Sequence, residues 1–226
     1  ATCAVGAMPN AGLPELTSDG ARYPLGPEGL ADALGQYLDE FGLGIIGGCC
    51  GTTPEHIRLL AERFAGRPVA ARTPEPERAS SSLYIEVPLA QDASYLSIGE
   101  RTNANGSKAF REAMLAGNWD ECVDIAKAQA RDGAHVLDLC ADYVGRDGAA
   151  DMSELAFRLS TAVTLPIVLD STEPHVIKAG LERLAGRSII NSVNFEDGDG
   201  PESRFAKVMP MVKEHGAAVV ALTIDE

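Results

Sequence analysis

The chain has 226 residues, of which 45% are hydrophobic and 23% charged, a composition typical of a globular protein with a substantial core. Its net charge is −14, and no basic stripe is available to replace the counterions of a nucleic acid or to meet an anionic membrane surface. No apolar run approaches the roughly eighteen residues that a membrane span requires, so we expect neither a nucleic-acid nor a membrane partner.

The cysteines are few and irregularly spaced, which is not typical of a disulfide framework. The N-terminus has no basic start and no long apolar core, so it is not predicted to be a signal peptide. It also lacks an initiator Met, and we expect a piece of a longer chain. We therefore predict a cytoplasmic protein in which some thiols serve as ligands; the five are Cys3, Cys49, Cys50, Cys122 and Cys140.

The first elements in the chain are predicted to be a helix, a strand and a second helix. Apolar residues at helical spacing cover 26–42, a short apolar run at 43–48 predicts a buried strand, and a second helical pattern covers 55–66. Thr53 precedes this second helix and is predicted to cap it.

Residues 67–94 are rich in proline and serine and show little periodicity, so they are predicted to form an interdomain linker. Within this segment, 82–89 is compatible with pairing at a sheet edge. Pro88 argues against a central strand, because proline cannot donate a hydrogen bond to a ladder.

From residue 95 onward, apolar strands alternate with amphipathic helices, which indicates a parallel sheet covered by helices. The predicted strands are 95–99, 135–140, 166–170, 188–193 and 217–224. The predicted helices are 107–115, 119–133, 152–163, 174–186 and 202–216.

Two architectures fit this alternation. An open dinucleotide-binding sheet requires a G-x-G-x-x-G turn after the first strand, and the glycines there have the wrong spacing. Polar residues instead recur at the C-terminal end of strand after strand, which is typical of a (β/α)8 barrel. We predict such a barrel, of which 95–226 supplies about five of the eight βα units.

Carboxylates and amides at the strand ends suit a neutral heterocycle with many donors and acceptors, such as a fused pyrimidine. The alternative is that polar residues there only cap the following helices, as Ser171 and Thr172 could. For Asp170 and Asn191 the binding interpretation is favoured, because both lie inside otherwise apolar strands and a buried carboxylate is costly without a partner.

Cys49 and Cys50 are adjacent, at the end of the predicted strand 43–48 and just before a helix. A disulfide between neighbours is strained, whereas thiolates beside a helix N-terminus are readily ionised. With a third thiolate they would hold zinc and leave one position open to a substrate sulfur. A buried structural pair is the alternative on spacing alone. None of the four histidines is predicted to be a ligand.

Several motifs resemble those of the cobalamin-dependent methionine synthases. "MPNAGLPEL" at 8–16 and "GGCCGTTPEHI" at 47–57 resemble the end of that family's homocysteine-binding zinc barrel. Three further motifs resemble the start of that family's methyltetrahydrofolate-binding barrel. They are "SIGERTNANGSKAFREAM" at 97–114, "LDSTEPHVIKAGL" at 169–181 and "INSVNFEDG" at 190–198. The resemblance covers essentially the whole chain.

The resemblance implies an α/β chain with two (β/α)8-type barrels, both represented only in part. Residues 1–66 would be the C-terminal part of the zinc barrel, 67–94 the linker, and 95–226 the N-terminal part of the pterin barrel. In the zinc barrel, Cys49 and Cys50 would be metal ligands. The third cysteine ligand is expected upstream of this chain, and Cys3 is not expected to replace it.

In the pterin barrel, the resemblance implies that Asp170 and Asn191 anchor the pterin, and that Glu100 and Asn103 are site residues. Asp138, on the second predicted strand, is added as a further candidate. No catalytic residue is assigned with them. The sequence departs from the family at Cys140, a position that is often Asn in the family. The resemblance therefore does not predict the ligand contacts at this strand end.

The implied activity is methyl transfer from 5-methyltetrahydrofolate through cobalamin to zinc-bound homocysteine, giving methionine and tetrahydrofolate. Cobalamin would be bound by a domain of the same full-length protein that is not in this chain, and the fragment alone is expected to be inactive. One alternative is a pterin-binding synthase of the dihydropteroate synthase type, and another is a non-catalytic fragment. Open barrel edges would also favour self-association.

Overall fold

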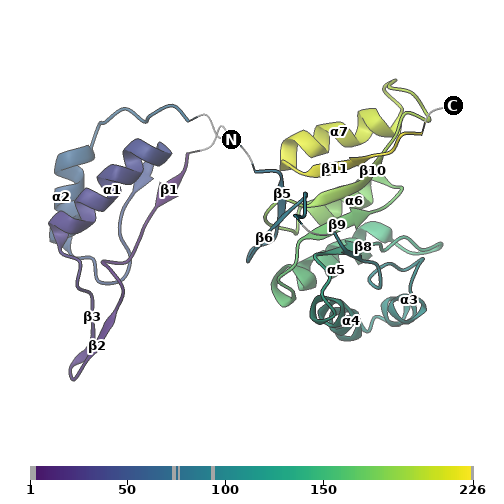
Figure 1. The fold of residues 1–226 in the computed structure, drawn as a ribbon, viewed down its shortest axis with the longest axis horizontal. Helices are drawn as coiled ribbons and strands as arrows, with labels where there is room; N and C mark the ends of the chain where they lie inside the picture. Colours follow the sequence, from purple (N-terminus) through teal and green to yellow (C-terminus); the bar gives the residue numbers. More distant parts are fainter. Residues whose placement is uncertain (1–3, 73–74, 76, 93–94, 225–226) are drawn as a thin grey trace. The chain divides into compact units, whose positions relative to one another are not determined.

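The computed structural model describes residues 4–72, 75, 77–92 and 95–224. The chain divides into two compact units, Ala1–Pro76 and Glu77–Glu226 (Figure 1). Cys3 lies outside the described residues, so its predicted lack of a ligand role stays a prediction. Within the described ranges, no helix combines the length and the apolar character needed to cross a bilayer.

The first unit contains the two predicted helices and the strand between them, together with a strand and a hairpin that the sequence did not indicate. The strand predicted to be buried at 43–48 is only two residues long, and its Ile45 is exposed, so the prediction of burial is wrong. Two very short strands pair in parallel, while the hairpin strands pair antiparallel. The elements are β1 (Gly6–Ala7), β2 (Glu15–Thr17), β3 (Gly20–Arg22), α1 (Pro27–Phe41), β4 (Ile45–Ile46) and α2 (Pro54–Phe64). Leu30, Leu34 and Leu60 bury the contact between the two helices.

The start of α2 is fixed by a reciprocal cap between Thr53 and His56. His56 Nε2 lies 3.0 Å from the carbonyl oxygen of Leu25, which only accepts, so this nitrogen carries the ring hydrogen. Nδ1 then accepts from the Thr53 main-chain N–H at 3.2 Å. His56 is therefore a buried structural histidine with both ring nitrogens hydrogen-bonded.

The second unit is built on a five-stranded parallel sheet in the order β7-β8-β9-β10-β11. Neighbours in the chain are neighbours in the sheet, and each crossover runs through helices, as in a (β/α) barrel (Figure 1). The α/β prediction is confirmed. The strands are β7 (Ile98–Gly99), β8 (Val136–Leu139), β9 (Ile167–Asp170), β10 (Ile189–Val193) and β11 (Ala218–Ala221).

The helices of this unit pack on the outer face of the sheet. Leu137, Leu169 and Ile190 point outward into the large core, where helix residues such as Met152 and Leu155 meet them. The helices are α3 (Lys108–Leu115), α4 (Trp119–Arg131), α5 (Gly148–Ala162), α6 (Pro174–Leu181) and α7 (Arg204–His215). All five predicted helices of this half are therefore present.

The segment predicted as a linker contains an antiparallel hairpin, β5 (Ala79–Ser81) and β6 (Glu86–Pro88). Val87 of this hairpin packs against Val136, Val168 and Ile189 on the inner face of the sheet. The hairpin therefore belongs to the second unit. Each strand of the hairpin has only three residues, which is too short to show the alternation of apolar and polar residues typical of a strand.

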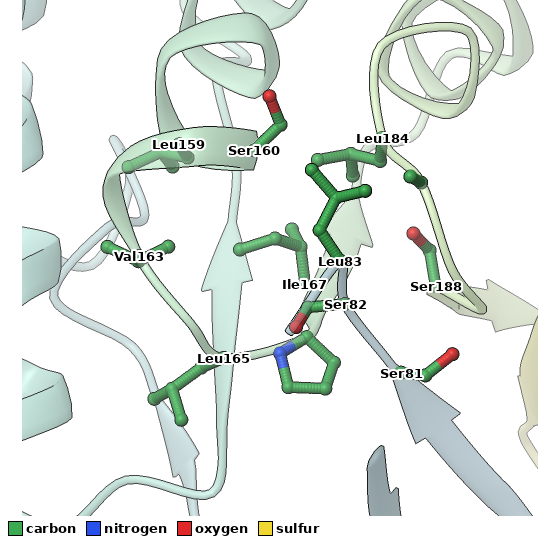
Figure 2. Close-up of a pocket in the computed structure, with 12 residues that line it drawn as sticks. Ser81, Ser82, Leu83, Leu159, Ser160, Val163, Leu165, Ile167, Leu184 and Ser188 are labelled. Atoms are coloured by element: carbon green, nitrogen blue, oxygen red, sulfur yellow. The ribbon is translucent and has the colours of Figure 1, made fainter. Parts of the chain in front are cut away.

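Main-chain pairing holds the hairpin at the N-terminal end of the sheet. Ser81 and Arg187 exchange two main-chain hydrogen bonds, each 3.0 Å long. Leu83, in the hairpin turn, lines a small pocket with Leu184 and Ile167 (Figure 2). The domain boundaries at 66 and 94 stay a prediction, but the hairpin shows that ordered contacts begin within the predicted linker.

We expect Gly180→Val to destabilise the second unit. A Cβ at Gly180, on the buried side of α6, would come within 2.6 Å of the Leu169 side chain and 3.2 Å of that of Met152. Overpacking of this kind costs about 1–3 kcal/mol in free energy of unfolding. Urea unfolding followed through the single tryptophan, Trp119, measures it.

The matched control is Gly200→Val, because a Cβ there meets nothing within 4 Å. Equal unfolding midpoints for the two variants would contradict the close packing of α6 on β9.

Candidate functional site

A cavity of about 610 Å³ lies along the inner face of the sheet of the second unit and reaches the C-terminal ends of its strands. All five predicted polar residues line it: Glu100, Asn103, Asp138, Asp170 and Asn191. Apolar side chains such as Ile98, Val168 and Ile189 line its lower part. The structure thus brings together residues that are far apart in the sequence.

The strand alternation explains why these side chains share one face. Successive residues of a strand point to opposite sides, so residues two apart point the same way. Val168 and Asp170 of β9 are in register with Ile189 and Asn191 of β10. The inner face therefore has an apolar floor, which includes Val168 and Ile189. Two residues further along the same strands, Asp170 and Asn191 form part of a polar rim.

Asn103 joins two carboxylates across this rim. Its Nδ2 donates to Asp138 Oδ2 at 2.8 Å and to Asp170 Oδ2 at 3.0 Å. Asn191 Nδ2 donates to the other oxygen of Asp170 at 3.3 Å. Four of the five predicted residues are thus linked by hydrogen bonds even without a ligand.

Both aspartates have pKa values above the ordinary range. Burial raises the pKa of Asp138 to about 6; the hydrogen bond from Asn103 opposes this, and the charges of Asp170 and Glu100 add to it. Burial also raises the pKa of Asp170, opposed by the same Asn103 hydrogen bond and by the positive charge of Arg204. The Asp138 carboxyl therefore changes its charge within reach of neutral pH.

Arg204, the first residue of α7, ties the ends of β9 and β10 together. Its guanidinium donates to the carbonyl oxygens of Ser171, Thr172 and Ser192 at 2.7, 2.6 and 2.6 Å. Sequence reasoning missed this residue. One feature of the sequence could have indicated it: Arg204 lies in the first turn of a predicted helix. The helix dipole disfavours a positive charge there unless carbonyl oxygens bind it.

Asp142, after β8, organises the end of β9. It accepts from Ser171 Oγ at 2.8 Å and from the main-chain N–H of Thr172 at 3.0 Å. Ser171 Oγ in turn accepts from the Glu173 N–H at 3.0 Å, just before α6. The N-cap residue of α6 is Glu173, and no side chain caps the helix, so the helix-capping interpretation of Ser171 and Thr172 is wrong. Asp170 and Asn191 instead line the cavity.

Cys140 is buried behind the rim, and burial raises the pKa of its thiol to about 12. The thiol stays protonated at neutral pH and accepts from Asn105 Nδ2 at 3.5 Å. This strand end therefore presents neither a thiolate nor a nucleophile to the cavity.

In the first unit, Cys49 and Cys50 are both exposed and form no disulfide, with their sulfurs 3.9 Å apart. The alternative of a buried structural pair is therefore wrong. The Pro9–Ala11 segment shapes their turn: Cys49 N donates to Pro9 O, and Cys50 N donates to Asn10 Oδ1 at 3.0 Å. The two motifs that resemble one zinc barrel thus meet in space.

The sulfur separation fits a shared zinc ion. A tetrahedral ion with Zn–S bonds of about 2.3 Å places two sulfurs about 3.8 Å apart. Among the described residues, no group of three His, Cys, Asp or Glu side chains gathers to hold a metal. Cys49 and Cys50 can therefore supply two ligands, and the third, expected upstream, stays a prediction.

Tyr23 stands beside this pair. A hydrogen bond with the Cys50 side chain raises the pKa of the Tyr23 hydroxyl. Its ring lies over Gly51, where a Cβ would come within 2.2 Å of Tyr23 Cγ. The glycine after the cysteines is thus required by the close approach of an aromatic ring, a role that the sequence did not reveal.

Comparison with known proteins gives a separate match for each of the two units. The family model for "Pterin binding enzyme" matches residues 99–226, and that for "Homocysteine S-methyltransferase" matches residues 1–64. The chain is 65% identical to the methionine synthase of Mycobacterium tuberculosis (strain ATCC 25618 / H37Rv) over 222 residues. It is 62% identical to the methionine synthase of Mycobacterium leprae (strain TN) over 228 residues.

Each of these alignments covers 98% of this chain and 19% of the relative. The chain therefore spans about a fifth of the length of the curated relatives it matches. The resemblance predicted from the sequence motifs is confirmed.

We expect Asp138→Asn to stabilise the second unit above pH 6. The variant keeps an acceptor for Asn103 and removes the charge. The folded-state pKa of about 6 exceeds the ordinary 3.8, so the ionised carboxylate destabilises the fold fully above pH 6 and not below about 3.8. The gain should therefore disappear as the pH falls through this window.

Urea unfolding of the native chain and the variant at a series of pH values measures this difference. Asp124→Asn, at an exposed position, is the control and should give little change. A stabilisation independent of pH would contradict the burial of an ionised carboxylate at Asp138.

Proposed function

The chain belongs to the pterin-binding enzyme family, and we propose that its second unit binds the pterin ring of 5-methyltetrahydrofolate, the methyl donor. One observation carries this proposal: Asp170 and Asn191 lie side by side in register on the inner face, at the polar rim of a cavity with an apolar floor. A flat heterocycle edged with donors and acceptors matches such a lining.

The recognition chemistry follows from the hydrogen-bonding capacity of the rim. Each Asp170 oxygen accepts one side-chain hydrogen bond, from Asn103 or from Asn191. Each carboxylate oxygen has about two acceptor positions, so both oxygens can also accept from the amino group and ring N–H of a pterin. Asn191 supplies an amide that both donates and accepts. Glu100 and Asp138 line the same cavity as further candidates.

We propose that the first unit contributes to a homocysteine site. The exposed thiols of Cys49 and Cys50 would hold zinc, with a third ligand from a segment upstream of this chain. Zinc bound there would lower the pKa of the homocysteine thiol and present it as a thiolate. The match to homocysteine S-methyltransferases over residues 1–64 supports this assignment.

The two half-sites together support a methionine synthase activity for the full-length protein. The methyl group would pass from 5-methyltetrahydrofolate to cobalamin, held by another domain of the same protein, and then to homocysteine. Methionine and tetrahydrofolate would be the products, in the cytoplasm. The homocysteine S-methyltransferase match favours this function over a dihydropteroate synthase, because the latter does not use homocysteine.

We expect the chain to bind 5-methyltetrahydrofolate, and Asp170→Asn to weaken binding by about 10- to 100-fold. A hydrogen bond to a charged group contributes about 1.5–3 kcal/mol, which corresponds to this range. Titration calorimetry near neutral pH measures the affinity. Glu214→Gln removes a charge at an exposed position of α7 and should leave binding unchanged.

Undiminished binding by Asp170→Asn would overturn the assignment of the rim. Affinity for a dihydropterin pyrophosphate and p-aminobenzoate, without affinity for 5-methyltetrahydrofolate, would instead favour the pteroate synthase alternative.

We expect metal binding to depend on both adjacent cysteines. In a Co²⁺ titration, the native chain should show thiolate-to-metal absorption, which Cys49→Ser and Cys50→Ser should each remove. Cys122→Ala is the control, because burial raises the pKa of that thiol to about 11 and keeps it protonated. Absorption that persists in the two serine variants would contradict a zinc site at this turn.

A further inference from the structure

We propose that Asn103 is a positioning residue of the pterin cavity and does not itself contact the pterin: it bridges Asp138 and Asp170 and keeps both carboxyl groups oriented and ionised for the ligand. This inference rests on the proposed function of the second unit as a pterin-binding site.

The hydrogen-bonding capacity of the Asn103 side chain is fully used. A primary amide offers two N–H donors and a carbonyl oxygen with two lone pairs. The amide nitrogen donates to Asp138 Oδ2 and Asp170 Oδ2. The carbonyl oxygen accepts from the main-chain N–H groups of Asn105 and Gly106 at 2.9 and 3.1 Å. A pterin could bond to Asn103 only by displacing one of these partners.

The main chain around Asn103 is also held in place. Its N–H donates to Glu100 O at 3.2 Å, and its carbonyl accepts from Ser107 N at 2.8 Å, at the start of α3. Asn103 further forms a parallel bridge with Cys140, after β8. The amide is therefore fixed from both sides, and its orientation is set before a ligand arrives.

The two hydrogen bonds from Asn103 reduce the repulsion between neighbouring negative charges at Asp138 and Asp170. Both carboxylates are partly removed from water, and an oxygen of each lies within 3.0 Å of the same Asn103 nitrogen. Glu100 and Asp142 add negative charge around them, Arg204 adds positive charge near Asp170, and the neighbouring Cys140 thiol is neutral. A neutral donor shared by both carboxylates stabilises their charged forms without adding a competing charge.

This role makes a distinct prediction about pH. The Asn103 hydrogen bond lowers the pKa of both Asp138 and Asp170, so its removal should raise both. A pterin that donates N–H groups requires the ionised carboxylates. In Asn103→Ala, each unit of rise in the Asp138 pKa should therefore weaken binding at pH 6 by about fivefold, approaching tenfold at lower pH. At higher pH, where the carboxyls are ionised again, the affinity should approach that of the native chain.

Two measurements test the proposal. Carbon-13 NMR titration of the aspartate carboxyls, without ligand, should show the Asp138 pKa above 6 in Asn103→Ala. Calorimetric titration with 5-methyltetrahydrofolate over a pH series should show the affinity profile moved to higher pH. Asn103→Asp is the second variant, because its side chain still accepts from Asn105 and Gly106 N–H and preserves the turn.

Asn118→Ala, at the start of α4, is the control and should leave both readouts unchanged. A loss of affinity that is equal at every pH, or unchanged carboxyl pKa values, would overturn the proposal and return Asn103 to direct contact with the ligand. If the native chain fails to bind 5-methyltetrahydrofolate, the proposed function fails, whereas the carboxyl titration still decides the role of Asn103.

Discussion

The parallel register of the second unit's sheet governs the rest of the site. In a parallel sheet the carboxyl ends of all strands meet at one edge, and every second side chain shares a face. Asp170 and Asn191 are in direct register, and Asp138 reaches them through Asn103. A one-residue slip of any of these strands would turn its polar side chain into the apolar core. The apolar core on the outer face therefore protects the geometry of the polar rim.

The rim concentrates buried negative charge, which a folded protein tolerates only when other groups stabilise it. Asn103 donates to two carboxylates, while Arg204 connects the two strand ends and adds a nearby positive charge. The outer core, rich in leucine and methionine, supplies the hydrophobic stabilisation that offsets this local cost. Binding chemistry and fold stability thus occupy opposite faces of the same strands.

The first unit has a similar arrangement with two cysteine thiols. A short strand ends in a glycine-rich turn, and two exposed thiols are held there by main-chain contacts to the Pro9–Ala11 segment. The separation of the sulfurs suits one tetrahedral metal ion. In both units, polar or thiol groups follow a parallel strand, where loops can differ without disturbing the core.

The sequence by itself determined the α/β alternation, the helices of both units, and five polar residues of the cavity lining, because apolar periodicity and strand-end polarity are local properties. It indicated strand pairing within 82–89, where β6 forms, but not the partner strand β5 or the attachment of this hairpin to Arg187 and to the inner face of the sheet. Nor did it reveal Arg204 or the bridging role of Asn103, because both depend on which strand ends become neighbours. Only the tertiary structure decides that, since contacts between distant segments arise from packing and register rather than from any local pattern.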